Sequence, residues 1–242
     1  MGRAFEFRKE RKMKRWSKMA KQFTRVGKDI VIAVKEGGPD PESNSRLRAV
    51  IQNAKAINMP KDNVERAIKK ATDKDTADYK EVNFEGYGPH GIAVFVECAT
   101  DNNNRTVANV RAVFNKCNGT FGTSGSVEFM FERKCHFKIM DQDFDLEELE
   151  FELIDFGAEE VFKDETDAAD ENECIMIYGD FPNFGSIQKE LETRGIEIVE
   201  SGFERIPTNT KALDNTKLEE VEKLLEKMEE EDDVMNVYHN MA

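Results

Sequence analysis

The sequence predicts an α+β protein with a helical N-terminal bundle and two ferredoxin-like modules of order βαββαβ, one inserted into the other. Three observations lead to this fold class. Apolar residues recur with the 3.6-residue period of helices through residues 1–80. Beyond residue 80, β-rich apolar runs alternate with helical stripes. Residues 136–204 follow the order strand-helix-strand-strand-helix-strand, which is that of the split βαβ motif.

Three short amphipathic helices are expected in the first part of the chain. Their apolar stripes cover residues 26–34, 47–57 and 64–71. Pro60 suits the first turn of the third helix, where its missing N–H group leaves no helical hydrogen bond unmade. Residues 72–80 have the polar composition of a linker. The sequence therefore predicts a small three-helix bundle.

The middle of the chain supplies only half of an α+β module. A strand, a helix and a strand are expected at residues 92–98, 107–117 and 127–131. A further strand, helix and strand are expected at residues 203–206, 218–228 and 234–238. We therefore predict three domains: a basic helical domain at 1–80, a discontinuous α+β domain at 81–135 plus 205–242, and an inserted acidic α+β domain at 136–204.

The formal net charge of −14 conceals a strong asymmetry along the chain. Residues 1–80 hold 21 Lys and Arg against 11 Asp and Glu, whereas residues 136–204 hold 4 against 22. A basic module on an acidic body is typical of a protein that binds a polyanion. The acidic part repels nucleic acid, so the basic part favours one bound orientation. The acidic domains are also candidates for protein contacts.

The composition of the chain indicates the cellular compartment of the protein. No stretch approaches the roughly 20 apolar residues that span a bilayer, and no apolar segment follows the basic N-terminus as in a secretory signal. Cys98, Cys117, Cys135 and Cys174 are widely spaced and lack the C-x-x-C pattern, which is typical of reduced, mostly buried thiols. These features predict a cytoplasmic protein without a membrane partner.

Basic residues of the helical domain are the candidate nucleic-acid contacts. The first 28 residues hold 11 Lys and Arg with interleaved aromatic residues, a composition that can neutralise phosphates and stack on bases. The alternative is a solvated tail with no partner. We expect phosphate contacts from Lys12, Lys14, Arg15, Lys18, Lys21, Arg25, Arg46, Arg48, Lys61, Arg66, Lys69 and Lys70. This pattern does not distinguish DNA from ribosomal or transfer RNA.

Two loops have an open interpretation. Asn104 and Arg105, between the first strand of the middle module and its helix, are a candidate anion site, although capping of the helix by Asn or Asp is favoured. The glycine-rich residues 119–126 form either a loop that folds over a ligand or one that needs positive φ angles. Residues 86–91 match G-x-G-x-x-G but precede a strand, so a tight turn is expected there.

An enzyme is not expected. His90, His136 and His239 are far apart in the chain and lack metal-ligand spacing. Neither a Gly-x-Ser-x-Gly elbow nor a phosphate loop is present. The sequence therefore predicts no catalytic residue, no metal site and no cofactor.

Several motifs resemble the YebC/PmpR family of probable transcriptional regulatory proteins. The main one is NMPKDNVERAIKK at residues 58–70. Others, in order, are FEGYGP, TDNNNRT, GTSGSV, FERK and VMNVYHN at residues 84–89, 100–106, 122–127, 131–134 and 234–240. One departure is the opening Gly2-Arg3-Ala4-Phe5, since the family usually begins with Gly-His-Ser-Lys-Trp. The nearest match here is at residues 15–20.

The resemblance implies a three-domain cytoplasmic protein with a helical domain and two α+β domains. It also implies a regulatory function, but the family is divided between DNA-binding transcriptional regulators and translational activators, including mitochondrial ones, that associate with the ribosome. The expected function is a DNA-binding transcriptional regulator, with a ribosome-associated translation factor as the alternative. A ligand-sensing or protein-interaction module is the third possibility.

Overall fold

The computed structural model describes residues 3–73, 78–164 and 174–242, and only the backbone of residues 3–18. The chain forms two compact units, Met1–Ala77 and Asp78–Ala242, and each is described by itself. In the described residues, no helix is long and apolar enough to cross a membrane.

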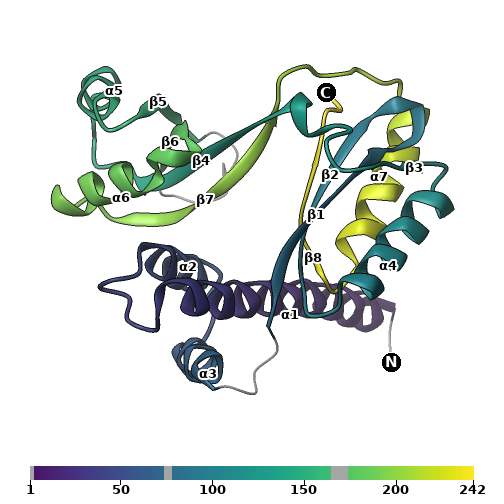
Figure 1. Ribbon diagram of the computed structural model, residues 1–242, viewed down its shortest axis with the longest axis horizontal. Helices are drawn as coiled ribbons and strands as arrows, with labels where there is room; N and C mark the ends of the chain where they lie inside the picture. The colour runs from purple at the N-terminus through teal and green to yellow at the C-terminus, as the bar shows by residue number, and fades with distance from the viewer. Residues whose placement is uncertain (1–2, 74–77, 165–173) are drawn as a thin grey trace. The chain divides into compact units, whose positions relative to one another are not determined.

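The described residues of the first unit form three helices (Figure 1): α1, Arg3–Gly37; α2, Ser45–Ala56; and α3, Lys61–Thr72. Helix α1 packs against both α2 and α3. Asn44 fastens the end of α1 to the start of α2. Its side-chain oxygen accepts from the N–H of Leu47 at 3.0 Å, and its amide nitrogen donates to the Ala33 carbonyl at 2.7 Å. The predicted bundle is confirmed, but its first helix has 35 residues and is not short, because the basic N-terminal segment is part of it.

The second unit begins with a four-stranded antiparallel sheet of order β3-β1-β2-β8. Its strands are β1 (Lys80–Tyr87), β2 (Ala93–Thr100), β3 (Thr120–Phe121) and β8 (Val234–His239). Helices α4 (Asn103–Lys116) and α7 (Asn215–Glu229) cover one face of this sheet (Figure 1). Val94, Val96, Val110, Phe114 and Leu224 are fully buried in the core between them. This core therefore joins residues from both ends of the unit's sequence.

A second four-stranded antiparallel sheet has the order β5-β6-β4-β7. Its elements are β4 (Phe131–Met140), α5 (Leu146–Ile154), β5 (Ala158–Lys163), β6 (Cys174–Asp180), α6 (Phe184–Thr193) and β7 (Ile198–Pro207). The order along the chain is strand-helix-strand-strand-helix-strand, as the sequence predicts for this part of the chain. The second sheet thus lies between the two halves of the first in chain order.

The first sheet does not have the predicted βαββαβ order. Strand β1 was not predicted, because Glu85 and Gly86 interrupt its apolar pattern, and it forms a hairpin with β2. The strand expected at residues 127–131 is instead a 3₁₀ turn at Glu128–Met130 followed by β4. The strand expected at 203–206 belongs to β7 of the second sheet. The ferredoxin-like prediction is therefore wrong for the first sheet.

The two sheets of the second unit are in direct contact. Arg205 of β7 is 7% exposed, and its Nε donates to Oε1 of Glu97 on β2 at 2.9 Å. Its guanidinium lies 3.9 Å from the ring centre of Phe95, which packs in a small core with Val127 and Phe131. A charged pair and an apolar cluster therefore hold the sheets together.

Candidate nucleic-acid interface

The candidate basic residues of α1 fall into two groups. Lys12, Lys14, Arg15 and Lys18 lie within the helix, but their side chains are outside the described residues. Lys21 and Arg25 are half-buried on the same helix. The four-residue spacing of Lys21 and Arg25 places them on one helix face. Helix α1 thus carries basic residues along its N-terminal half.

Two predicted contacts on α2 have structural partners within the helical unit. Arg46 forms an ion pair with Glu36 of α1, with Nη1 and Oε2 2.7 Å apart. Arg48 donates from Nη1 to the carbonyl oxygens of Pro41 at 2.8 Å and Glu42 at 3.0 Å. These bonds brace the turn between α1 and α2, so both arginines stabilise the bundle itself.

Helix α3 presents the remaining basic side chains. Lys61, Arg66, Lys69 and Lys70 are all exposed, and the last three share a face because they are spaced by three and four residues. Arg66 donates from Nε to the Asp62 carbonyl at 3.1 Å and also contacts the Asn63 side chain. Since both partners are neutral groups, they orient the guanidinium without cancelling its charge. Among the described candidates, α3 offers the most accessible cations.

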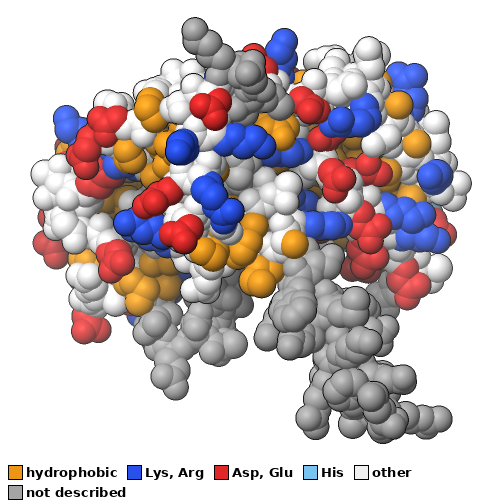
Figure 2. Space-filling model, turned by 90° about the horizontal axis from the view of Figure 1, so that it is seen from below, with side chains coloured by type: hydrophobic (Ala, Val, Ile, Leu, Met, Phe, Trp, Pro, Cys, Tyr) orange, Lys and Arg blue, Asp and Glu red, His pale blue; other side chains and the backbone are white. Residues whose placement is uncertain are grey.

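A shallow hollow lies between α1 and α3. Its lining includes Phe23, Thr24, Met59, Asn63, Arg66, Ala67 and Lys70. Figure 2 shows blue Lys and Arg side chains mixed with red Asp and Glu on the face that it views. Asp62 and Glu65 are the acidic residues of α3, and Lys61 lies 3.5 Å from Glu65. Asp62 and Glu65 line a second hollow together with Arg66 and Lys69, so nearby carboxylates offset part of the positive charge on this face of α3.

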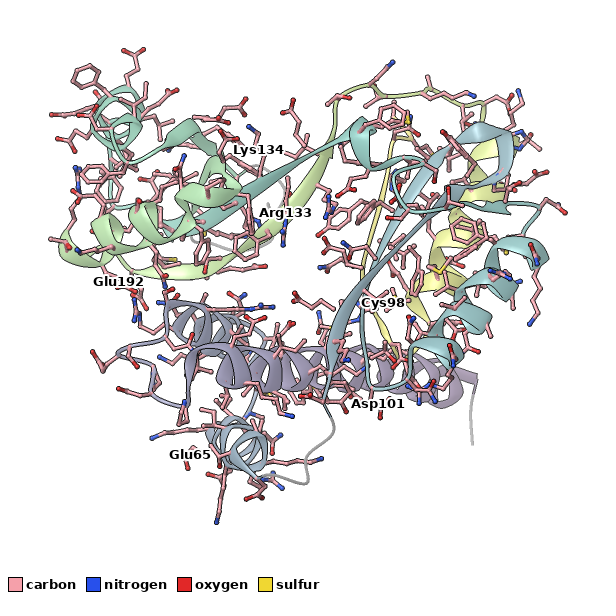
Figure 3. All side chains as sticks on the ribbon, viewed as in Figure 1. Glu65, Cys98, Asp101, Arg133, Lys134 and Glu192 are labelled. Atoms are coloured by element: carbon pink, nitrogen blue, oxygen red, sulfur yellow. The ribbon has the colours of Figure 1, made fainter. Side chains whose placement is uncertain are left out.

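The side chain of Arg105 forms ion pairs with carboxylates of the protein itself. Its guanidinium bonds Asp233 Oδ2 at 2.8 Å and Asp101, at the start of α4 (Figure 3), at 2.9 Å. Hydrogen bonds to Asp233 and then Asp101 raise the pKa of Arg105. Asn102 caps α4 by accepting from the N–H of Arg105 at 3.1 Å, and the Asn104 side chain is exposed. The capping interpretation is confirmed, and the Arg105 guanidinium is paired with carboxylates of the protein.

The glycine-rich loop at 119–126 is held by a distant residue that the sequence did not indicate. Glu85 is 3% exposed, and its carboxylate accepts from the N–H groups of Gly125 and Val127 at 2.6 Å and Glu128 at 2.8 Å. Gly125 has a φ of +82°, which favours glycine. The loop is therefore anchored by three charge-assisted bonds rather than loosely attached.

The remaining motifs have structural roles. Residues 86–91 comprise the last two residues of β1 and the tight turn that leads into β2, so the expected turn is present. His90 bonds Glu220 at 2.9 Å, and no group of three or more metal-ligating side chains occurs in the described ranges. The four cysteines, all in the described ranges, form no disulfide, and all but Cys174 are buried. Burial raises the pKa of the Cys135 thiol to about 11, so this thiol is not a ready nucleophile.

Comparison with known proteins agrees with this arrangement of a basic helical unit and two antiparallel sheets. Residues 3–74 match the family described as the TACO1/YebC protein N-terminal domain, and residues 79–241 match the TACO1/YebC second and third domain. A "Probable transcriptional regulatory protein" of Flavobacterium psychrophilum is 71% identical over 100% of this chain and 99% of its own. One of Porphyromonas gingivalis is 59% identical over 100% and 97%.

A solved structure shows the same fold. The crystal structure of a conserved hypothetical protein, Aq1575 of Aquifex aeolicus, has a TM-score of 0.77 and 38% identity, and covers 92% of this chain and 90% of its own. These matches define the class: three-domain α+β proteins whose relatives carry names of regulators and not of enzymes. The chain belongs to the TACO1/YebC family.

Proposed function

We propose that this protein is a DNA-binding transcriptional regulator of the cytoplasm that contacts phosphates through its basic helical unit. The exposed cationic face of α3, formed by Arg66, Lys69 and Lys70, is the observation that carries the proposal. Lys and Arg that neutralise phosphates release counterions, which favours binding of any sequence. The names of the relatives, each a probable transcriptional regulatory protein, support DNA as the partner.

The other candidate residues complete this interface in the proposal. They are Lys12, Lys14, Arg15, Lys18, Lys21, Arg25, Arg46, Arg48 and Lys61. We also propose the division into domains at 1–80, 81–135 plus 205–242, and 136–204, the last with a ferredoxin-like fold whose strands β4 and β7 extend it to residues 131 and 207. The strongly acidic 136–204 domain would repel nucleic acid and leave its surface for protein partners.

Charge reversal on α3 tests the proposal. We expect Lys61, Lys69 and Lys70→Glu to weaken binding to every duplex sequence and to lower the slope of log affinity against log salt, by about 0.9 for each phosphate that is no longer neutralised. The matched control reverses three lysines of α7, Lys217, Lys223 and Lys227, which makes the same change in net charge. Equal effects of the two triple variants on affinity would contradict a binding face on α3.

RNA is the alternative partner, because the family that the sequence resembles also includes translational activators that associate with the ribosome. Tight binding to a defined DNA duplex in moderate salt supports transcriptional regulation. Co-sedimentation with ribosomes under the same conditions, without duplex binding, supports the translation factor. The α3 variants would reduce either interaction, because phosphate contacts do not depend on base sequence.

A further inference from the structure

An open groove runs between the outer edge of β1, helix α4 and the anchored loop. Its volume is about 660 Å³, within the range of small-molecule sites. All of its lining residues belong to the second unit: Asn83, Phe84, Glu85, Val107, Arg111, Asn115, Gly119, Thr120, Phe121, Gly122, Thr123 and Ser124. None of them is among the phosphate contacts proposed above.

The loop wall of this groove is preorganised. Three backbone N–H groups of residues 125–128 bond the Glu85 carboxylate, and the Gly122 N–H donates to the Glu85 carbonyl at 2.8 Å. A side chain at Gly122 would collide with Ser126, since an added Cβ would lie 3.2 Å from the Glu85 carbonyl and closer still to the serine. A fixed wall lowers the entropy that the protein loses when it binds a ligand, because the loop is already ordered.

An arginine and an aromatic ring form a flat platform in the groove. The Arg111 guanidinium lies 5.0 Å from the ring centre of Phe121. The rings of Phe84 and Phe114, each 6.0 Å from Phe121, hold that ring in place. Arg111 is exposed and forms no ion pair among the described residues. Its charge is therefore available to a ligand.

Hydrogen-bonding side chains surround the platform. Asn83, Asn115, Thr123 and Ser124 are exposed and line the groove. The single carboxylate of the lining belongs to Glu85, whose oxygens already accept three N–H bonds. The groove thus combines a flat surface, amide groups and an uncompensated cation. These are the features that recognise an unstacked base and its phosphate.

We propose that this groove binds an unpaired nucleotide of a nucleic acid. The base stacks on the Arg111–Phe121 pair, its edges meet the amides of Asn83 and Asn115, and the phosphate charge lies near Arg111. This inference rests on the proposed nucleic-acid-binding function but places a second contact on the other unit. It also specifies single-stranded or looped nucleic acid, because a base within a duplex cannot reach such a platform.

The test uses the full-length protein and six-nucleotide single strands of mixed sequence, as RNA and as DNA, each carrying one photoreactive thio-base. We expect Arg111→Ala and Phe121→Leu each to weaken single-strand binding about tenfold, the order expected for loss of one stacked base. Crosslinks should map to residues 107–124. Arg133→Ala is the matched control, because Arg133 also stacks on a phenylalanine, 3.7 Å from the ring centre of Phe181, but lies outside the groove.

Other outcomes separate this proposal from the previous one. Arg111→Ala lies on an exposed helix face and should fold normally even if Phe121→Leu does not. Duplex affinity that falls with the α3 variants but not with Arg111→Ala supports both proposals. Single-strand affinity that Arg111→Ala leaves unchanged, or crosslinks confined to other segments, would overturn the nucleotide site alone. If the groove instead holds an extended peptide that pairs with the open edge of β1, Arg111→Ala would leave single-strand affinity unchanged. That result overturns the nucleotide site.

Discussion

Arg66 and Lys69 of the helical unit differ in their surroundings from Lys134 and Arg205 of the second unit. In the helical unit, Arg66 bonds a carbonyl and a neutral side chain, and Lys69 is exposed. In the second unit, Lys134 lies between Asp180 at 2.8 Å and Glu159 at 2.6 Å, and Arg205 pairs with Glu97. Asp180 and then Glu159 raise the pKa of the Lys134 ammonium. A neutral acceptor orients a cation and leaves its field intact, whereas a carboxylate cancels it.

This contrast explains why a count of charges is a poor guide to an interface. Figure 3 shows Arg133 and Lys134 on β4, neighbours in sequence with different surroundings: one stacks on Phe181 and the other joins two carboxylates. In both units the same residue types either remain exposed, as Lys69 does, or pair with a carboxylate and link elements of the fold, as Arg46 and Arg205 do. Arg111 of the second unit likewise lies over an aromatic ring, and it lines the proposed nucleotide groove.

The largest expected effect comes from the best-buried crosslink. We expect Arg205→Ala to lower the free energy of unfolding by about 3 kcal/mol, because Glu97 keeps a charge at a contact that excludes most water. Lys69→Ala, on the exposed face of α3, should change stability by less than about 0.5 kcal/mol. Urea unfolding measures both. Similar losses in the free energy of unfolding for the two variants would contradict the contrast between the paired Arg205 and the exposed Lys69.

The next largest effect is expected at Glu85, whose carboxylate is bound by backbone N–H groups. Glu85→Gln should lower the free energy of unfolding by about 2 kcal/mol, since the loop N–H groups lose a charged acceptor. Amide hydrogen exchange at Gly125 and Val127 should become faster. Glu81→Gln, on an exposed position of the same strand, is the control. Unchanged exchange in the Glu85 variant would show that the carboxylate does not anchor the loop.

The smallest effect is expected at a pair near the end of β4. Lys163, 2.9 Å from Asp141, lowers the pKa of the Asp141 carboxyl in the folded protein. Its contribution is therefore present above the unfolded pKa of about 4 and is lost as pH falls through the lower folded value. Asp141→Asn should reduce this acid dependence by less than about 1 kcal/mol. Thermal melts from pH 6 to pH 2 measure it, and an unaltered slope would contradict the pair.

Local patterns predicted the elements that are stabilised locally. The apolar stripes of α2 and α3 and the cap at Asn102 depend on residues within one or two turns, and all three were visible in the sequence. The order of the second sheet was predicted because its six elements are consecutive. The first sheet was not predicted, because its halves are separated and β1 contains a buried carboxylate that resembles a surface residue.

The candidate interface could be predicted only as a set of charges. Whether Arg46 and Arg105 attract a ligand or pair with Glu36 and Asp233 depends on contacts between distant parts of the chain. The groove was missed for the same reason. Glu85 meets its loop about forty positions along the chain, and Arg111 on its helix has the spacing of an ordinary solvated residue.

Strands β4 and β7 have a consequence for how this chain folds. They are neighbours in the second sheet, with Phe131 opposite Pro207, so the chain leaves the first sheet and returns about 5 Å away. Once the second sheet has formed, the paired ends of β4 and β7 hold the two halves of the first sheet close together. The second sheet then acts as a short connection between these halves and not as a long loop. Closing a short loop costs less entropy. We therefore expect the second sheet to form early and to accelerate the docking of α7 and β8, whose contacts would otherwise be among the slowest of the chain.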